Sequence, residues 1–267
     1  MSFLQLQDVH THFPVRGGAF SGATGKVIKA VDGVSLNIEK GEILGLVGES
    51  GCGKSTLSRT IMQLVRPTGG SIILDQEDLC LMPRSLVRRR RLEFQMIFQD
   101  PYASLNPRMT VFSTLAEAII QRKPQLKRNR PDLLSAISDL MKLVGLDPRF
   151  MRKYPHEFSG GQRQRIAIAR ALAPEPQLII ADEPVSALDV SIQSQILNLL
   201  LKLRKELNLT MIFISHDLSV VRYLADNIAV MLAGKIVEYG PADRVFHEPE
   251  HDYTKKLLSA IPHLTTT

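Results

Sequence analysis

Apolar residues fall into short runs along this chain, and their spacing changes from strand-like to helix-like and back. Two runs, Ile43–Val47 and Gln177–Asp182, are almost continuously apolar, which is typical of strands buried in a parallel sheet. Further strands are predicted at residues 3–15, 27–38, 71–75, 94–98, 209–215, 228–232 and 235–239. Helices are predicted at residues 111–121, 131–144, 163–172, 191–207, 219–225 and 253–260. Strands that alternate with helices predict an α/β fold with a mostly parallel sheet.

The strand pattern stops between residues 99 and 158, where helical spacing takes over. We therefore expect a helical subdomain at 99–158, inserted into a core formed by residues 1–98 and 159–267. A chain of 267 residues is long enough for one such core and one subdomain.

A glycine-rich stretch joins the strand at Ile43–Val47 to the start of a helix. It fits the P-loop pattern of Gly, four residues, then Gly-Lys-Ser. Glycines let backbone N–H groups turn toward phosphate oxygens, and the helix N-terminus adds positive potential. We expect Lys54 to reach the β- and γ-phosphates of a nucleotide and the Ser55 hydroxyl to ligate Mg²⁺. The residues expected to form this nucleotide site are Gly48, Ser50, Gly51, Cys52, Gly53, Lys54, Ser55 and Thr56.

Composition and charge indicate the compartment of the protein and the kinds of partner that it can bind. No apolar run approaches the roughly 20 residues of a membrane span, and the first residues lack the pattern of a signal peptide. Two cysteines, Cys52 and Cys80, do not make a disulfide framework, so we expect reduced thiols in the cytosol. The run Arg88–Arg91 leaves three interpretations open: a solvated basic segment, contact with phospholipid head groups, and nucleic acid. Nucleic acid is disfavoured because the run has no interleaved aromatic residues, and we expect no nucleic-acid partner.

Two carboxylates end the apolar run at 178–182. Asp182 fits the Walker B position, where an aspartate holds Mg²⁺ through its water shell. Glu183 stands where a carboxylate can polarise the water that attacks the γ-phosphate. The alternative interpretation is an Asp-Glu pair that caps the next helix.

A third motif opens the helix predicted at 163–172. Ser159 is suited to cap that helix, and Gly160 and Gly161 expose backbone N–H groups that can bind an anion. Together with Gln162 they form Ser-Gly-Gly-Gln, placed between the P-loop and the Asp-Glu strand. This order resembles the signature of the ABC-transporter ATPase family.

The resemblance to that family covers nearly the whole chain. Gln99 matches the Q-loop glutamine, Ser186–Asp189 matches the D-loop, and His216 matches the H-loop histidine, all in the family's order. The resemblance implies an N-terminal antiparallel β part beside the P-loop core. It also implies a stacking aromatic for adenine, for which Phe13 is the best match and Phe20 a weaker rival. The alternative interpretation of Phe13 is an ordinary core phenylalanine.

The resemblance assigns a role to each matched residue. It implies ATP and Mg²⁺ as cofactors, with Glu183, His216 and Gln99 acting in hydrolysis. The implied metal-binding residues are Ser55, Gln99 and Asp182. The residues implied to contact ATP held by a second subunit, or to couple the two sites, are Ser159, Gly160, Gly161, Gln162 and Asp189.

These implied roles require two chains arranged head to tail, because each P-loop would then face the partner's Ser159. ATP would close the dimer and hydrolysis would open it. The segment 98–108, together with 154–158, 182–191 and 250–258, resembles the oligopeptide/dipeptide importer ATPases. We expect residues 102–108 to line the groove for a permease's cytoplasmic helix.

Membership of that subfamily would place the chain on the cytoplasmic face of the cell membrane. Its partners would be a second ATPase subunit (a paralogue or a copy of this chain), two permeases, and an extracytoplasmic solute-binding protein. Alternatives are an importer of nickel or glutathione, a non-transport ABC ATPase, and an inert regulatory subunit. The complete set of motif residues argues against the last. Many members continue into a cysteine-containing tail, and no chemistry of such a tail is carried over to this chain.

Overall fold

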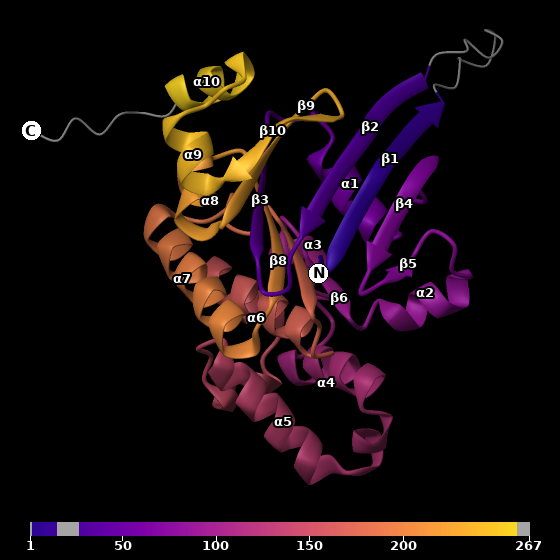
Figure 1. Ribbon diagram of the computed structural model, residues 1–267. Coiled ribbons are helices and arrows are strands. Elements are labelled where there is room, and N and C mark those ends of the chain that lie inside the picture. The colour runs from indigo at the N-terminus through magenta and orange to yellow at the C-terminus, as the bar shows by residue number, and fades with distance from the viewer. Residues whose placement is uncertain (1, 15–26, 261–267) are drawn as a thin grey trace, which may run out of the picture. The chain divides into compact units, whose positions relative to one another are not determined.

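The computed structural model describes residues 2–14 and 27–260, which fold into two compact units (Figure 1). Unit 1 comprises residues 1–87 and 212–267, and unit 2 comprises residues 88–211. The predicted division into 1–98 with 159–267 and 99–158 stays a prediction.

The first sheet of unit 1 is antiparallel. Its strands are β1 (Leu4–Pro14), β2 (Val27–Ile38), β4 (Gly69–Leu74) and β5 (Glu77–Asp78), in the order β2-β1-β4-β5. The buried Thr11 hydroxyl of β1 lies 2.9 Å from the Thr60 hydroxyl of α1 (Lys54–Ile61), which ties the sheet to that helix. The N-terminal antiparallel part is therefore confirmed.

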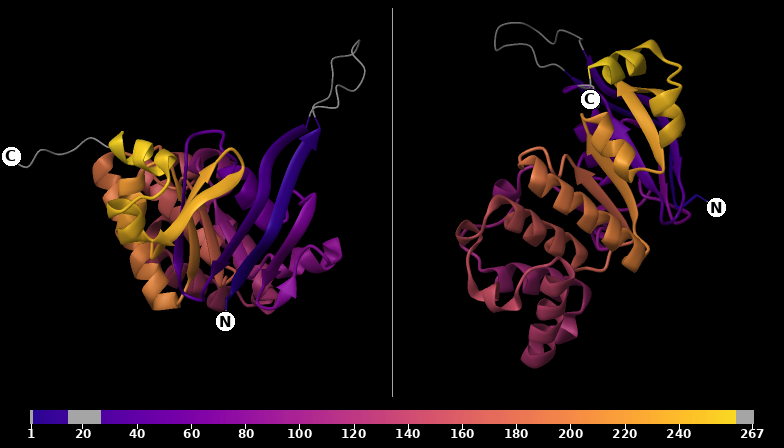
Figure 2. Two further views of the ribbon diagram at one scale, coloured as in Figure 1. Left: turned by 45° about the horizontal axis from the view of Figure 1, so that its top comes forward. Right: turned by 90° about the vertical axis from the view of Figure 1, so that its left-hand side faces the viewer.

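Unit 1 also contains strands adjacent in the order β10-β9-β3-β8. These are β3 (Ile43–Val47), β8 (Thr210–Ser215), β9 (Asn227–Leu232) and β10 (Lys235–Pro241). β3 and β9 are parallel, whereas β9 and β10 pair antiparallel as a hairpin, labelled in Figure 1 and drawn in orange to yellow in Figure 2. Helix α8 (Leu218–Leu224) packs closely on β3, because a Cβ added at Gly45 would lie 2.0 Å from Val221 Cγ1. Helices α9 (Ala242–His247) and α10 (Asp252–Ser259) complete the unit.

Unit 2 pairs the parallel strands β6 (Phe94–Ile97) and β7 (Leu178–Asp182). Helix α6 (Gly160–Leu172) packs against β6 and against four helices. These are α3 (Pro101–Ser104), α4 (Val111–Arg122), α5 (Arg130–Leu143) and α7 (Val190–Leu207). Three short 3₁₀ helices lie at Pro124–Arg128, Pro148–Arg152 and Pro155–Glu157. The helical content predicted after residue 99 is present, and the α/β class with mostly parallel pairing around the P-loop strand is confirmed.

Some elements were not predicted, among them β5, α9 and helix α2 (Arg84–Arg90). The basic run ends α2, where Arg88 and Arg89 are exposed and Arg90 pairs with Glu93 at 2.5 Å. Positive side chains near a helix C-terminus stabilise the helix by interacting with its dipole. This interaction is a local structural explanation for the arginine run. In the part of the chain that the structure describes, no helix is long and apolar enough to span a bilayer.

Candidate nucleotide-binding and hydrolysis site

The P-loop follows β3 and ends in the first turn of α1. Gly53 precedes the helix with φ of 116°, and a Cβ there would lie 2.1 Å from the Ala30 carbonyl oxygen. A Cβ at Gly48 would lie 2.3 Å from the Met231 carbonyl oxygen. Side chains at these two positions would collide with neighbouring backbone, so the glycines let the loop pack tightly against β2 and β9.

The loop wraps around Lys54, whose side chain is buried. The ammonium Nζ donates to the carbonyl oxygens of Gly48 at 2.6 Å and Glu49 at 2.9 Å. It also lies 3.8 Å from the thiol of the buried Cys52. Ser55, next along α1, is exposed. The lysine amine and the serine hydroxyl are thus both fixed at the start of one helix.

A residue far along the chain holds the P-loop from outside. The backbone N–H of Glu49 donates to the hydroxyl of Tyr253 at 2.8 Å. Tyr253 is buried in α10, whose start is fixed because Glu238 accepts from the backbone N–H groups of Glu250 (2.9 Å) and His251 (3.1 Å). Sequence reasoning missed this contact, since the two residues are 204 positions apart and no local pattern joins them.

The other predicted residues of unit 1 lie at strand ends. Phe13 is near the end of β1, opposite Ile28, and 39% exposed. Phe20, the rival aromatic, lies outside the described residues. His216 directly follows β8 and is exposed, and the next residue, Asp217, caps α8 by accepting from Ser219 N at 2.8 Å. His216 is therefore fixed between a buried strand and a capped helix.

In unit 2 the structure brings two of the three predicted hydrolytic residues, Gln99 and Glu183, together. Gln99 follows β6, and its side-chain amide donates to a carboxylate oxygen of Glu183 at 3.0 Å. Asp182 is the last residue of the fully buried strand β7. Glu183 has a φ of 46°, a left-handed conformation that costs a non-glycine residue about 1–2 kcal/mol. Such strain is found at functional positions, and the carboxylate of this residue is the one that accepts from the Q-loop glutamine.

The signature motif forms the predicted helix cap. Ser159 Oγ accepts from Gln162 N at 3.3 Å, and Gln162 Oε1 accepts from Ser159 N at 3.1 Å, which completes a capping box at the start of α6. A Cβ at Gly161 would lie 2.6 Å from Ile192 Cγ2 on α7. Asp189, the D-loop residue that precedes α7, is exposed. The signature and the D-loop are therefore held together by close packing of α6 on α7.

A second contact that sequence reasoning missed joins the Q-loop segment to α6. The guanidinium of Arg163 lies 3.8 Å from the centre of the Tyr102 ring. Arg163 is buried and also donates to the carbonyl oxygens of Pro155 at 2.7 Å and His156 at 3.2 Å. One arginine thus links the residues after Gln99 to the helix that begins at the signature.

Comparison with known proteins identifies the family to which this chain belongs. Residues 31–186 match the family model described as ABC transporter, and residues 237–267 match the model described as Oligopeptide/dipeptide transporter, C-terminal region. The chain belongs to the ABC transporter family. Within it, the chain is an ATP-binding subunit of the oligopeptide/dipeptide branch, an ATPase that hydrolyses ATP to drive transport.

Relatives in this branch are similar over nearly the whole chain. The Oligopeptide transport ATP-binding protein AppF of Bacillus subtilis is 51% identical over 98% of this chain and 78% of its own length. The Dipeptide transport ATP-binding protein DppF of Escherichia coli is 49% identical over 98% of this chain and 77% of its own length. The Glutathione import ATP-binding protein GsiA of Pectobacterium atrosepticum is 48% identical over 97% of this chain and 41% of its own length.

A solved structure has the same fold. It is described as the dimeric structure of a post-hydrolysis state of the ATP-binding cassette MJ0796 bound to ADP and Pi. The TM-score is 0.77 with 29% identity, over 90% of this chain and 98% of that one.

Proposed function

We propose that the chain hydrolyses ATP with Glu183 as the base, in a site completed by a second subunit, to power peptide uptake. The observation that carries the catalytic part is the 3.0 Å hydrogen bond between Gln99 and Glu183. It fixes a strained carboxylate that directly follows the Walker B strand.

The chemistry is an in-line displacement at the γ-phosphorus. The oxygen of a water molecule bonds to phosphorus, the bond to the ADP oxygen breaks, and the water proton passes to the Glu183 carboxylate. Gln99 orients that carboxylate through its amide N–H. Lys54 binds the β- and γ-phosphates, exchanging its present carbonyl partners for phosphate oxygens. His216 and Phe13 are proposed to contact the γ-phosphate and adenine.

The donor set of the chain fits Mg²⁺, which prefers hard oxygen ligands. Ser55 offers a hydroxyl, Asp182 a carboxylate, and Gln99 an amide oxygen, since its nitrogen is used toward Glu183. When bound, the ion neutralises charge on the β- and γ-phosphates.

The exposed signature completes the site of a partner. The capping box leaves Ser159 exposed at the N-terminus of a helix of 13 residues, where an anion is stabilised by free backbone N–H groups. Two chains arranged head to tail would place it on the partner's ATP. The dimeric cassette bound to ADP and Pi supports the dimer itself.

The proposal for the transported solute is based on relatives in the oligopeptide/dipeptide branch. The peptide-transport relatives support di- or oligopeptides, and the glutathione-import relative supports glutathione as a second candidate. The proposed partners are a second ATPase subunit, two permeases and an extracytoplasmic solute-binding protein, with this chain at the cytoplasmic membrane face. The permease is proposed to dock on residues 102–108, where Tyr102 and Arg108 are exposed. Crosslinking from Tyr102 in membranes tests this, and a permease crosslinked only elsewhere would contradict it.

The catalytic proposal is tested by Glu183→Gln. We expect phosphate release to fall by at least about 100-fold, while ATP binding remains and a dimer accumulates in ATP, detected by light scattering. Glu206→Gln on the exposed surface of α7 is the matched control and should hydrolyse ATP normally. Normal turnover in Glu183→Gln would refute the role of this carboxylate.

A further inference from the structure

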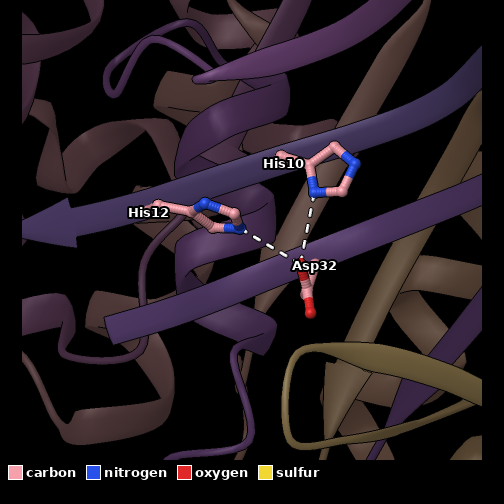
Figure 3. A group of neighbouring side chains, drawn as sticks. All are labelled: His10, His12 and Asp32. Atoms are coloured by element: carbon pink, nitrogen blue, oxygen red, sulfur yellow. Dashed lines mark hydrogen bonds and ion pairs between the residues drawn. The ribbon is translucent and has the colours of Figure 1, made fainter. Parts of the chain in front are cut away.

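Three metal-ligating side chains lie together on the antiparallel sheet of unit 1, apart from the residues of the P-loop. His10 and His12 project from β1, and Asp32 projects from β2 between them (Figure 3). His10 Nδ1 lies 3.3 Å and His12 Nε2 lies 3.2 Å from the same oxygen, Asp32 Oδ1. One ligand atom from each residue lies within 4.8 Å of the other two.

Strand register explains why these residues meet. His10 stands directly opposite Asp32 in the β1–β2 ladder, so their side chains share a face of the sheet. Thr11 points into the core toward α1, which leaves His10 and His12 on the other face. An irregularity in the register between Thr11 and His12 brings the second imidazole toward the same carboxylate.

Two of the three separations between the ligand atoms match a tetrahedral metal centre, and the third, between the imidazole nitrogens, is within 4.8 Å. Zinc–nitrogen bonds of about 2.0–2.1 Å at tetrahedral angles place neighbouring ligand atoms roughly 3.3 Å apart. The two imidazole–carboxylate distances of 3.3 and 3.2 Å already have this value. Two imidazoles and one carboxylate, with a position left for water, are a donor set typical of Zn²⁺.

An outer carboxylate supports the same assignment. The second ring nitrogen of His10, Nε2, lies 3.0 Å from Asp8 Oδ1. Metal-bound histidines usually donate their other ring N–H to such a partner, which fixes the ring and its tautomer. Asp8 reaches this place because it sits at a bulge of β1 with φ of 47°. Gly33 leaves room, since a Cβ there would lie 3.2 Å from the Asp8 carboxylate.

The two oxygens of the Asp32 carboxylate have different neighbours: lysines lie near one, and the imidazoles contact the other. Lys29 Nζ lies 3.4 Å and Lys235 Nζ lies 4.0 Å from Asp32 Oδ2, the oxygen that the imidazoles do not contact. The imidazoles are 28% and 25% exposed, so an ion can reach them.

We propose that His10, His12 and Asp32 bind a divalent transition metal ion of the Zn²⁺ class, with Asp8 orienting His10. The ion would join β1 to β2 and stiffen that edge of the sheet. The site is distinct from the proposed Mg²⁺ site, whose ligands are all oxygen.

The test uses the untagged full chain, stripped of metal and kept in excess Mg²⁺ without nucleotide. Co²⁺ is titrated as a spectroscopic probe and then displaced by Zn²⁺, whose Kd is measured against a chromophoric chelator. We expect one equivalent of Co²⁺ with the visible absorption of a four-coordinate ion, displaced by Zn²⁺ but not by Mg²⁺. Zn²⁺ should also raise the Tm of the chain, because it binds the folded site.

Variants decide which residues hold the ion. His12→Ala and Asp32→Asn should each weaken Zn²⁺ binding by at least about 100-fold and remove the Tm increase, whereas Asp8→Asn should weaken it about 10- to 100-fold. His247→Ala, which removes an exposed histidine elsewhere in unit 1, should change neither. Circular dichroism confirms that each variant is folded. No bound equivalent, binding that survives in folded His12→Ala, or a thiolate-to-Co²⁺ band from Cys52 or Cys80 would overturn the proposal.

Discussion

Tyr253 provides a sharp test of how the P-loop is held, because one hydroxyl connects it to α10. Tyr253→Phe keeps the buried ring and removes only the oxygen that accepts from Glu49 N–H at 2.8 Å. A neutral hydrogen bond contributes about 0.5–1.5 kcal/mol, and the exposed Glu49 allows water to replace part of it. We therefore expect a loss of about 1 kcal/mol in the free energy of ATP binding, or roughly a fivefold higher Kd.

The state of the Tyr253 hydroxyl is settled by its surroundings. Burial raises the pKa of Tyr253 from its ordinary value of 10.0, so the phenol stays protonated across physiological pH. The effect of Tyr253→Phe should accordingly be the same at pH 6 and pH 8.

The assay is equilibrium ATP binding to the chain without Mg²⁺, so that hydrolysis does not interfere. Tyr239→Phe is the matched control, because it makes the same chemical change in unit 1 at a hydroxyl that donates to the Asn37 carbonyl oxygen at 3.4 Å and not to the P-loop. A Kd for Tyr253→Phe equal to that of Tyr239→Phe and of the unmodified chain would refute the idea that α10 shapes the P-loop.

Two further predictions concern packing and thiol chemistry. Gly161→Ala places a Cβ 2.6 Å from Ile192 Cγ2 and should lower the free energy of unfolding by about 1–3 kcal/mol. Gly160→Ala is the control and should cost less, because its Cβ would lie 3.5 Å from the nearest side-chain atom. Equal Tm values for the two variants would contradict this. Burial, together with the Asp78 charge, raises the pKa of the Cys80 thiol to about 11. Its alkylation, followed by mass spectrometry, should therefore be slow at pH 8, accelerate about tenfold per pH unit toward pH 11, and be faster in Asp78→Asn; a pH-independent rate would contradict this.

Local patterns in the sequence predicted most of the fold and the motif positions. The continuous apolar run before Asp182 predicted β7, and Ser159 formed the expected helix cap, to which the structure adds Gln162. Both signals are local, because one is the spacing of apolar residues along the chain and the other is a hydrogen bond between residues three positions apart. The P-loop glycines were likewise evident from their spacing, and the close backbone approaches at Gly48 and Gly53 give the physical reason for them.

The contacts that the sequence did not predict depend on tertiary structure. The pairing of His10 with Asp32 requires the register of β1 on β2, which bulges shift by residues that no local pattern specifies. The Arg163–Tyr102 contact requires α6 and α3 to be packed together. Helix α2 was missed because its seven residues have a single buried position, Val87, and so show no apolar period.

The central claim is that one chain supplies half of each hydrolytic site. Two variants of this chain test it, Lys54→Ala, which disables the P-loop, and Ser159→Arg, which blocks the signature toward a partner. Each alone should lose most of the ATPase activity that the unmodified chain shows by itself. An equimolar mixture should regain activity, because a mixed dimer contains one site with an intact P-loop from one chain and an intact signature from the other. Activity of the mixture that stays at the mean of the two separate variants would contradict the head-to-tail account.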